Sequence, residues 1–378
     1  MTDRQARFLQ PLDVLFLRGN KAFGDPGSFG ESTMPPLPSV AAGALRSRML
    51  VDAGIDPVAF ARGDAAHPAL GTASTPGEFA VSGLHPARRG PDGTIETLHP
   101  LPADLVATET AGRWSVRRLQ ALAMHDSPLA SSAPLHCWPV LADAARGKPV
   151  SGLWLTAAGW EACLAGHAPD PSQLVPTGAL WQRDERIGVG LDPQRRAAAD
   201  SQLFTSQAIA MRPGVGLLVE AELPGDCALP EQGLLRFGGD GRAVALEPAT
   251  PPVMHADLGR LAAAGRLRLV LTTPGLFADG SRLPGMTADG SWAFGGVRGR
   301  VVCAALPRPM TVSGWDLARE VPKTAQRAVP AGAVYWIDAL DADADALRKL
   351  VNRGLWSAPC EDPGRRAEGF NRLALAHW

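Results

Sequence analysis

Cysteine is scarce in this sequence, and the few cysteines form no pattern. The five are scattered along the chain, and no two are spaced as a C-x-x-C pair. Because disulfide frameworks and structural zinc sites both need closely ordered cysteines, neither is expected. The composition favours a protein of the reducing cytoplasm, and nothing in it predicts a bound metal or cofactor.

The sequence also lacks an excess of charge of either sign and lacks long apolar runs. Lys and Arg together number 37 against 38 for Asp and Glu, a net charge of -1. Such a protein has no bulk positive field, so any nucleic-acid site must be a local patch. No apolar run comes near the roughly 18 residues of a membrane helix, and the first residues lack the apolar core of a signal peptide. We therefore expect no membrane span and no secretion.

Familiar catalytic motifs are missing as well. The chain contains no G-x-S-x-G, no G-x-x-x-x-G-K-[ST] and no H-E-x-x-H. Its eight histidines raise the question of a metal-free ribonuclease, which needs a general base that titrates near neutral pH. No motif pairs His85, His99, His125 or His136 with Ser, Tyr or Lys, and Tyr335 is the single tyrosine. We expect no enzyme, and one catalytic histidine stays open as the alternative.

Two acid-containing segments are similar to functional loops, but each lacks a part. FGGDG (237–241) has the Gly-Gly-Asp turn of nucleotide-cyclase and polymerase palms, yet no second acid follows Asp240 at the needed place. A β-hairpin turn with positive φ angles explains it more simply. DALDADADAL (338–347) has the alternating acids of a calcium loop without its glycine and final glutamate. Its acids are expected to cap and favour the start of a helix that ends near Gly354.

The remaining composition is that of a folded protein with many loops. The chain has 378 residues, 46% of them hydrophobic and 20% charged, which suits two domains. Gly and Pro, at 41 and 34, are spread along the chain and imply short elements joined by turns. Short strands interleaved with few helices predict an α+β protein with antiparallel sheets. Strands are expected at 8–17, 78–84, 151–157, 215–223, 242–248, 266–273, 299–306 and 333–340, and helices at 40–53, 156–165, 256–264 and 341–353.

The first strand leads into a Gly-rich loop and then a helix. Residues 19–38 are largely turn residues and end in a proline cluster, so Ser39 is expected to be the N-cap of the helix. Arg46 falls outside the apolar stripe of this helix and is therefore placed to meet a ligand. Arg48 falls inside the stripe and needs a partner or a path to solvent. The stripe consists of Val40, Ala41, Ala44, Leu45, Met49 and Val51.

Residues 181–211 have the pattern of one long β-hairpin. WQRDERIGVGL and SQLFTSQAIAM alternate, and DPQRRAAAD joins them. The alternation places Arg183 and Arg186 on opposite faces, so the two arginines can serve different contacts. Arg195 and Arg196 lie in the connection between the strands.

Three segments together resemble the RAMP-superfamily subunit that caps the 5′ end of type III-B (Cmr) CRISPR effector complexes, the third of the Cmr set. They are PLDVLFLRGNKAFG (11–24) with PPLPSVAAGALRSRML (35–50), ERIGVGLDPQRRAAADSQLFT (185–205) and PAGAVYW (330–336). Weaker agreement extends over LTTPGLF (271–277), GWDLA (314–318) and EGFNRLALAHW (368–378). The segments follow one another in order over nearly the whole chain.

The resemblance implies two ferredoxin-like (βαββαβ) domains, at 1–206 and 207–378, with the hairpin as a thumb-like insertion in the first. It implies a non-catalytic, RNA-binding subunit that grips the repeat-derived 5′ tag of the crRNA. The expected partners are this crRNA, the large cyclase/nuclease subunit and a backbone RAMP subunit.

On this resemblance, the candidate RNA contacts lie in the hairpin and around the N-terminal loop and helix. Lys21 and Arg46 would meet phosphates, as would free N–H groups near Ser39. Gly188 would let backbone approach backbone, and Phe204 would stack on a base. The full set of candidates is Arg18, Lys21, Ser39, Arg46, Arg183, Arg186, Gly188, Gly190, Arg195, Arg196, Phe204, Lys323 and Arg327.

Plainer interpretations stay open. Asp184, Glu185 and Asp192 neutralise much of the positive charge of the hairpin, which also fits a solvated hairpin without a ligand. Two competing functions are an endoribonuclease that trims precursor guide RNA and a structural subunit whose positive patches meet acidic proteins.

Overall fold

The chain divides into two compact units, each assembled from separate stretches of sequence. A computed structural model describes residues 2–19, 29–123, 135–142, 147–192, 194–252, 257–316 and 321–378. Unit one comprises Met1–Glu96, Thr177–Pro251 and Val312–Ala325, and unit two comprises Thr97–Pro176, Pro252–Thr311 and Gln326–Trp378. The boundary expected after residue 206 falls inside strand β13 (Ala198–Met211) of unit one. The observed units differ from two consecutive halves because strands distant in sequence share each sheet.

The main sheet of unit one is built around its first strand. Its order is β15-β16-β1-β14-β3-β4, and β1 is antiparallel to β14 on one side and to β16 on the other. Ala6 and Phe8 of β1 are buried with Ala87 and Leu218. β1 ends at Pro11, well before the expected residue 17, and the chain then leaves this sheet. The strands are β1 (Thr2–Pro11), β3 (Ala80–Arg89), β4 (Ile95–Thr97), β14 (Val215–Pro224), β15 (Gly233–Arg236) and β16 (Ala243–Ala249).

Helix α1 (Pro38–Asp52) packs against β3 and β15. The N-cap is Leu37 and Pro38 holds the first helical position, so the expected N-cap at Ser39 is wrong. Proline fits that position because its fixed φ suits the helix and its missing N–H has no intrahelical partner to lose. The buried residues of the helix are Pro38, Ala41, Ala42, Leu45, Met49 and Leu50.

The structure shows the surroundings of Arg48 and Val51, two α1 residues that the sequence pattern placed in the apolar stripe. Arg48 has the partners it was expected to need, because Nε lies 2.6 Å from Asp52 and Nη1 lies 3.1 Å from the carbonyl oxygen of Leu234. Val51, expected in the apolar stripe, is 60% exposed. The buried face of the helix therefore ends at Leu50, one residue before the expected Val51.

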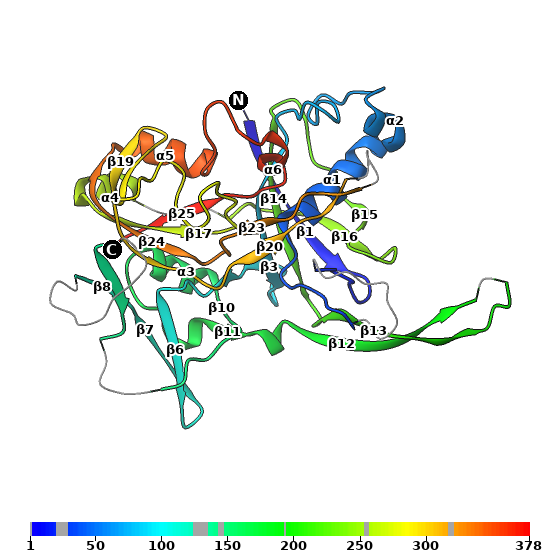
Figure 1. Ribbon diagram of the computed structural model, residues 1–378, viewed down its shortest axis with the longest axis horizontal. Coiled ribbons are helices and arrows are strands. Elements are labelled where there is room, and N and C mark those ends of the chain that lie inside the picture. The colour runs from blue at the N-terminus through cyan, green and yellow to red at the C-terminus, as the bar shows by residue number, and fades with distance from the viewer. Residues whose placement is uncertain are drawn as a thin grey trace. The chain divides into compact units, whose positions relative to one another are not determined.

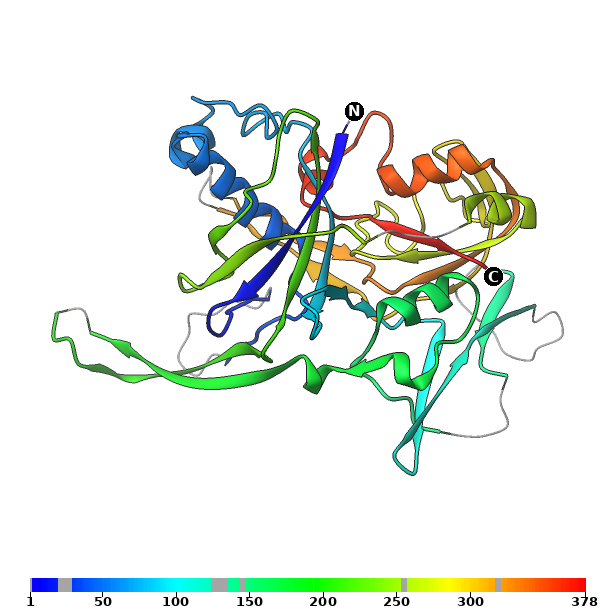
Figure 2. The ribbon, with the colours of Figure 1, turned by 180° about the vertical axis from the view of Figure 1, so that it is seen from behind.

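The long hairpin expected at 181–211 is confirmed. Its strands β12 (Trp181–Leu191) and β13 pair from Trp181 opposite Met211 to Leu191 opposite Ala198. Nearer its base, β13 also pairs in parallel with β2 (Phe29–Gly30). The distal part extends beyond the other strands of unit one (Figures 1 and 2). The unit also contains α2 (Pro57–Arg62), a short 3-10 helix (Thr177–Ala179), β21 (Trp315–Asp316) and β22 (Val321–Pro322).

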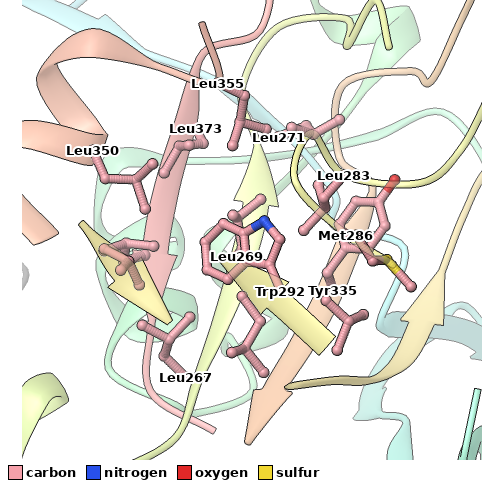
Figure 3. Packing of buried hydrophobic residues seen from close by; sticks show 14 of the residues in the cluster. Leu267, Leu269, Leu271, Leu283, Met286, Trp292, Tyr335, Leu350, Leu355 and Leu373 are labelled. Atoms are coloured by element: carbon pink, nitrogen blue, oxygen red, sulfur yellow. The ribbon is translucent and has the colours of Figure 1, made fainter. Parts of the chain in front are cut away.

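Unit two has a second antiparallel sheet with the order β18-β19-β24-β17-β25. Its core includes Leu269 of β17, Tyr335 of β24 and Trp292 of β18 (Figure 3). The Tyr335 hydroxyl donates to the carbonyl oxygen of Ser281 at 2.7 Å, so its polar end is satisfied in the core. The strands are β17 (Leu267–Leu271), β18 (Ser291–Phe294), β19 (Val297–Ala305), β24 (Val334–Asp341) and β25 (Leu373–Ala376).

The acidic segment 338–347 starts a helix, as expected. Helix α5 runs over Ala344–Arg353, and the Asp343 side chain caps it by accepting from the Ala346 N–H at 2.7 Å. Asp345 lies in the first turn, where a negative charge is stabilised, and Gly354 follows the last helical residue with φ 73°. These acids therefore have a structural role in the helix.

A buried ion cluster in unit two joins several segments that are distant in sequence. Asp104 and Arg268 are both fully buried, with an oxygen of Asp104 lying 2.5 Å from Arg268 and 2.6 Å from Arg118. Arg268 also donates to the carbonyl oxygens of Cys163 and His377, at 2.7 and 2.8 Å. Removing the side chain of one member would leave a buried charge without one of its partners.

The smaller elements of unit two include β20, whose last residue, Val312, belongs to unit one. They are β5 (His99–Pro100), β6 (Leu105–Thr110), β7 (Arg113–Arg118), β8 (Gln120–Ala123), β9 (Cys137–Val140), β10 (Leu153–Leu155), α3 (Ala157–Leu164), a 3-10 helix (Pro171–Gln173), β11 (Leu174–Pro176), α4 (Leu258–Ala264), β20 (Met310–Val312), β23 (Gln326–Ala328) and α6 (Pro363–Ala367).

The described elements make this a mixed α and β protein with many strands and few helices, which is the class expected from the sequence. Within the described ranges, no helix has the length and apolar character needed to cross a membrane.

Candidate nucleic-acid interface

A pocket lies within unit one beside the middle of the hairpin, and the distal part of the hairpin, with Arg195 and Arg196, continues beyond it. Its volume is about 180 Å³. Arg18 and Phe204, two of the residues predicted to contact RNA, line it together. We call it the root pocket; its lining residues are Phe16, Arg18, Gly30, Ser32, Phe204, Ser206, Gln207 and Asp240.

Backbone pairing brings these distant segments together. After β1 ends, Leu15 forms an antiparallel bridge with Ile209 of the hairpin, and Arg18 forms one with Ser32. The Ser32 hydroxyl donates to the carbonyl oxygen of Gln207, which fixes the segment after β2 to the hairpin. The residues that follow the first strand therefore join the hairpin and place Phe16 and Arg18 beside Phe204.

The FGGDG segment forms the turn between β15 and β16, which confirms the hairpin interpretation. Phe237 N–H donates to the Arg242 carbonyl oxygen at 2.8 Å, and Gly238, Asp240 and Gly241 have φ of 77°, 54° and 66°. A β-carbon at Gly238 would lie 2.6 Å from the Phe16 carbonyl oxygen, so only glycine permits this close approach.

The same turn supplies a site residue that the sequence pattern did not indicate. Gly239 N–H donates to the Phe16 carbonyl oxygen at 2.7 Å, which anchors the turn beside the root pocket. Asp240 thereby comes to lie 3.4 Å from the Arg18 guanidinium. Asp240 is also marked by its backbone, because its φ is left-handed, which is uncommon for residues other than glycine.

Two further arginines surround the Phe16 ring. The guanidinium carbon of Arg242 lies 5.2 Å from the ring centroid, and that of Arg186 lies 6.0 Å away. Arg186 is exposed and pairs with Asp184 at 2.9 Å, while Arg242 pairs with Asp13. The predicted contact Arg186 thus lies next to the root pocket, with its charge partly neutralised by its own strand.

The hairpin glycines make room for side chains of the opposite strand. Gly188 is paired directly with Phe204, and a β-carbon at Gly188 would lie 2.3 Å from the Phe204 ring. Gly190 is similarly close to the side chain of Gln202, at 2.9 Å. Gly188 therefore provides the space in which the half-buried Phe204 ring lies across the strand.

The hairpin exposes both charge and apolar surface along its length. Arg183 is exposed, and Arg195, with 84% of its side chain exposed, lies 4.0 Å from Asp192. Arg196 adopts φ 51° in the connection. The apolar residues that alternate on one face are also exposed, with Ile187 at 80%. The exposed arginines provide donors for phosphates along an arm that contacts solvent on both faces.

The other predicted contacts are not part of the root pocket. Arg46 is half-buried on α1, and Ser39 lies in the first turn of that helix. Lys21 is outside the described residues. Lys323 belongs to unit one and Arg327 to unit two, where Arg327 lines a separate pocket of about 700 Å³.

The histidines that raised the ribonuclease alternative include two that are buried. Burial lowers the pKa of His85 to about 4, so its imidazole is neutral at pH 7. His99 stacks on Trp160 with ring centroids 4.5 Å apart. His125 lies outside the described residues. Among the residues that are described, no group of three or more His, Cys, Asp or Glu side chains is arranged to hold a metal ion.

Comparison with known proteins gives one family and a distant structural likeness. The family model described as "CRISPR-associated protein (Cas_Cmr3)" matches residues 7–378. A chain of a type III-B Cmr-beta complex, imaged by cryo-EM with cognate target RNA and AMPPnP, is 13% identical with a TM-score of 0.52, covering 99% of both chains. Another, from Cmr-beta with cognate target RNA, is 12% identical with a TM-score of 0.44, covering 88% of this chain and 86% of its own. No curated protein sequence matches significantly. The likeness at 13% identity supports the fold alone.

Proposed function

Because the chain belongs to the Cas_Cmr3 family of CRISPR-associated proteins, we propose that it is the Cmr-complex subunit that holds the repeat-derived 5′ tag of the crRNA without cleaving it. The observation that carries this proposal is the root pocket. There Arg18 and Phe204, far apart in the sequence, line one cavity beside a long exposed hairpin.

The charges and rings of this region suit single-stranded RNA. Arg183, Arg195 and Arg196 lie along the exposed hairpin, where they can contact phosphates in succession. Phe204 presents a partly exposed ring on which an unstacked base can lie. A local patch of this kind is what a chain of net charge -1 requires for binding RNA.

We further propose that each unit is a ferredoxin-like domain. The main strands of unit one that follow one another as β1, β3, β14 and β16 have the spatial order β16-β1-β14-β3. In unit two, β17, β19, β24 and β25 have the equivalent order β25-β17-β24-β19. The first-to-third and first-to-fourth pairs are antiparallel in both units, which supports a common topology. The large cyclase/nuclease subunit and a backbone RAMP subunit are the proposed protein partners.

Sequencing of the RNA that co-purifies with the tagged chain from its host tests the proposal. We expect 5′ ends that begin within the repeat. A paired reversal, Arg183→Glu with Arg186→Glu, should reduce binding of a tag RNA to the purified chain, while Arg62→Glu on the exposed end of α2 should not. Unaltered RNA binding by the paired variant, with loss of the protein partners, would contradict the proposal and support a structural subunit. Cleavage of repeat RNA in EDTA would support a ribonuclease.

A further inference from the structure

An acid in the root pocket limits what can occupy it. Asp240 lies at a pocket whose other charged lining residue is Arg18. A carboxylate repels a phosphate, so a phosphate group alone would gain little from this pocket. A group that offers hydrogen-bond donors as well as acceptors could contact both side chains at once.

The size and the walls of the pocket favour a flat ring. A volume of about 180 Å³ corresponds to roughly six water molecules at about 30 Å³ each. Phe16 and Phe204 are the aromatic lining residues. Because the face of an aromatic ring accepts any nucleobase by stacking, the pocket suits one unstacked base of a single strand.

The ion pair at the pocket is loose enough to open toward a ligand. Arg18 Nη2 and Asp240 Oδ1 are 3.4 Å apart, longer than the roughly 2.7–2.9 Å of a strong charge-assisted hydrogen bond. The side chains are 60% and 48% exposed. By contrast, the backbone of Asp240 is held firmly, because its turn is bonded to the Phe16 carbonyl oxygen through Gly239. The backbone that carries the carboxylate is therefore fixed beside the pocket.

We propose that the root pocket binds a single guanine base, with Asp240 and Arg18 reading its edge. This inference rests on the proposed function, since it names the base that the RNA-holding site selects. Guanine presents two neighbouring donors, N1–H and the N2 amino group, which match the two oxygens of Asp240. Its O6 and N7 are the acceptors that an arginine contacts in many nucleic-acid complexes. Adenine, cytosine and uracil lack the neighbouring pair of donors.

The test measures the affinity of the purified full chain for short oligouridines in which one central uridine is replaced by guanosine, adenosine or cytidine. Fluorescence anisotropy of labelled RNA gives each dissociation constant. For the unaltered chain, we expect the guanosine oligonucleotide to bind about tenfold more tightly than the adenosine, cytidine and unsubstituted uridine oligonucleotides. Asp240→Asn keeps a residue that tolerates the left-handed φ, and it should abolish this preference while the affinity for oligouridine changes little.

A matched control separates the possible results. Asp64→Asn, at an exposed acid of the same unit, should retain the preference for guanosine. Equal binding of all four oligonucleotides by the unaltered chain, or a guanosine preference that survives Asp240→Asn, would overturn the inference while leaving the proposed function intact. Failure of all four to bind would contradict the proposed function itself.

Discussion

Replacement of Gly188 by alanine should weaken RNA binding without weakening the fold. The added β-carbon would lie 2.3 and 2.4 Å from two atoms of the Phe204 ring, far inside van der Waals contact, so the ring must leave its place at the root pocket. Stacking of one base on an aromatic ring is worth about 1–3 kcal/mol. Loss of that contact corresponds to a roughly 5- to 150-fold rise in the dissociation constant.

The same substitution should leave the thermal midpoint unchanged or slightly raised, because glycine inside a strand is unfavourable. Anisotropy with a labelled tag RNA measures the affinity, and differential scanning calorimetry measures the stability. Phe204→Ala should match Gly188→Ala in affinity. Gly190→Ala, where the added β-carbon would meet Gln202 and not Phe204, should have a much smaller effect on RNA affinity. An affinity of Gly188→Ala equal to that of the unaltered chain would refute the assignment of Phe204 as a stacking residue.

Three further predictions concern stability. Arg268→Met should lower the unfolding free energy by about 3 kcal/mol in urea titrations, because it leaves the fully buried Asp104 with Arg118 alone; a loss below about 1 kcal/mol would contradict the role of this cluster. Burial lowers the pKa of His85 to about 4, so the unfolded chain takes up the proton first as the pH falls below about 6.5. The unfolding free energy should therefore drop by up to about 3 kcal/mol between pH 6.5 and 4, and His85→Leu should remove this part of the drop; an unchanged pH profile in the variant would count against it. Asn371→Leu should cost about 2–4 kcal/mol, because the buried Asn371 side chain bonds to three backbone groups and its φ is 63°; near-native stability in the same titrations would exclude this role.

Features set by neighbouring residues were predictable from the sequence. The alternation in 181–211 predicts the hairpin, and the acids with Gly354 predict α5, which ends at Arg353 as expected but begins at Ala344 and not at residue 341. The N-cap at Ser39 is wrong because Pro38 competes for the first helical position. The strand expected to run to residue 17 ends at Pro11, where the chain turns to pair with the hairpin instead.

Features set by distant residues were not predictable in this way. Arg18 and Asp240 meet across 222 positions of sequence, and no local pattern marks their pairing. The alternation of residues along β12 also does not show why position 188 is a glycine, because the Phe204 ring that fills the space beside it comes from the opposite strand. The division into units could not be found from a single boundary, since each sheet takes strands from several separate stretches.

Ultraviolet crosslinking of the intact, RNA-loaded complex, followed by mass spectrometry of the crosslinked peptides, tests the central claim most directly. If the root pocket and the hairpin hold the crRNA 5′ tag, tag nucleotides should be joined to the peptides that contain Phe16 and Phe204, and Gly188→Ala should reduce the second of these crosslinks. Tag nucleotides joined only to unit two of this chain, or only to other subunits, would contradict the account.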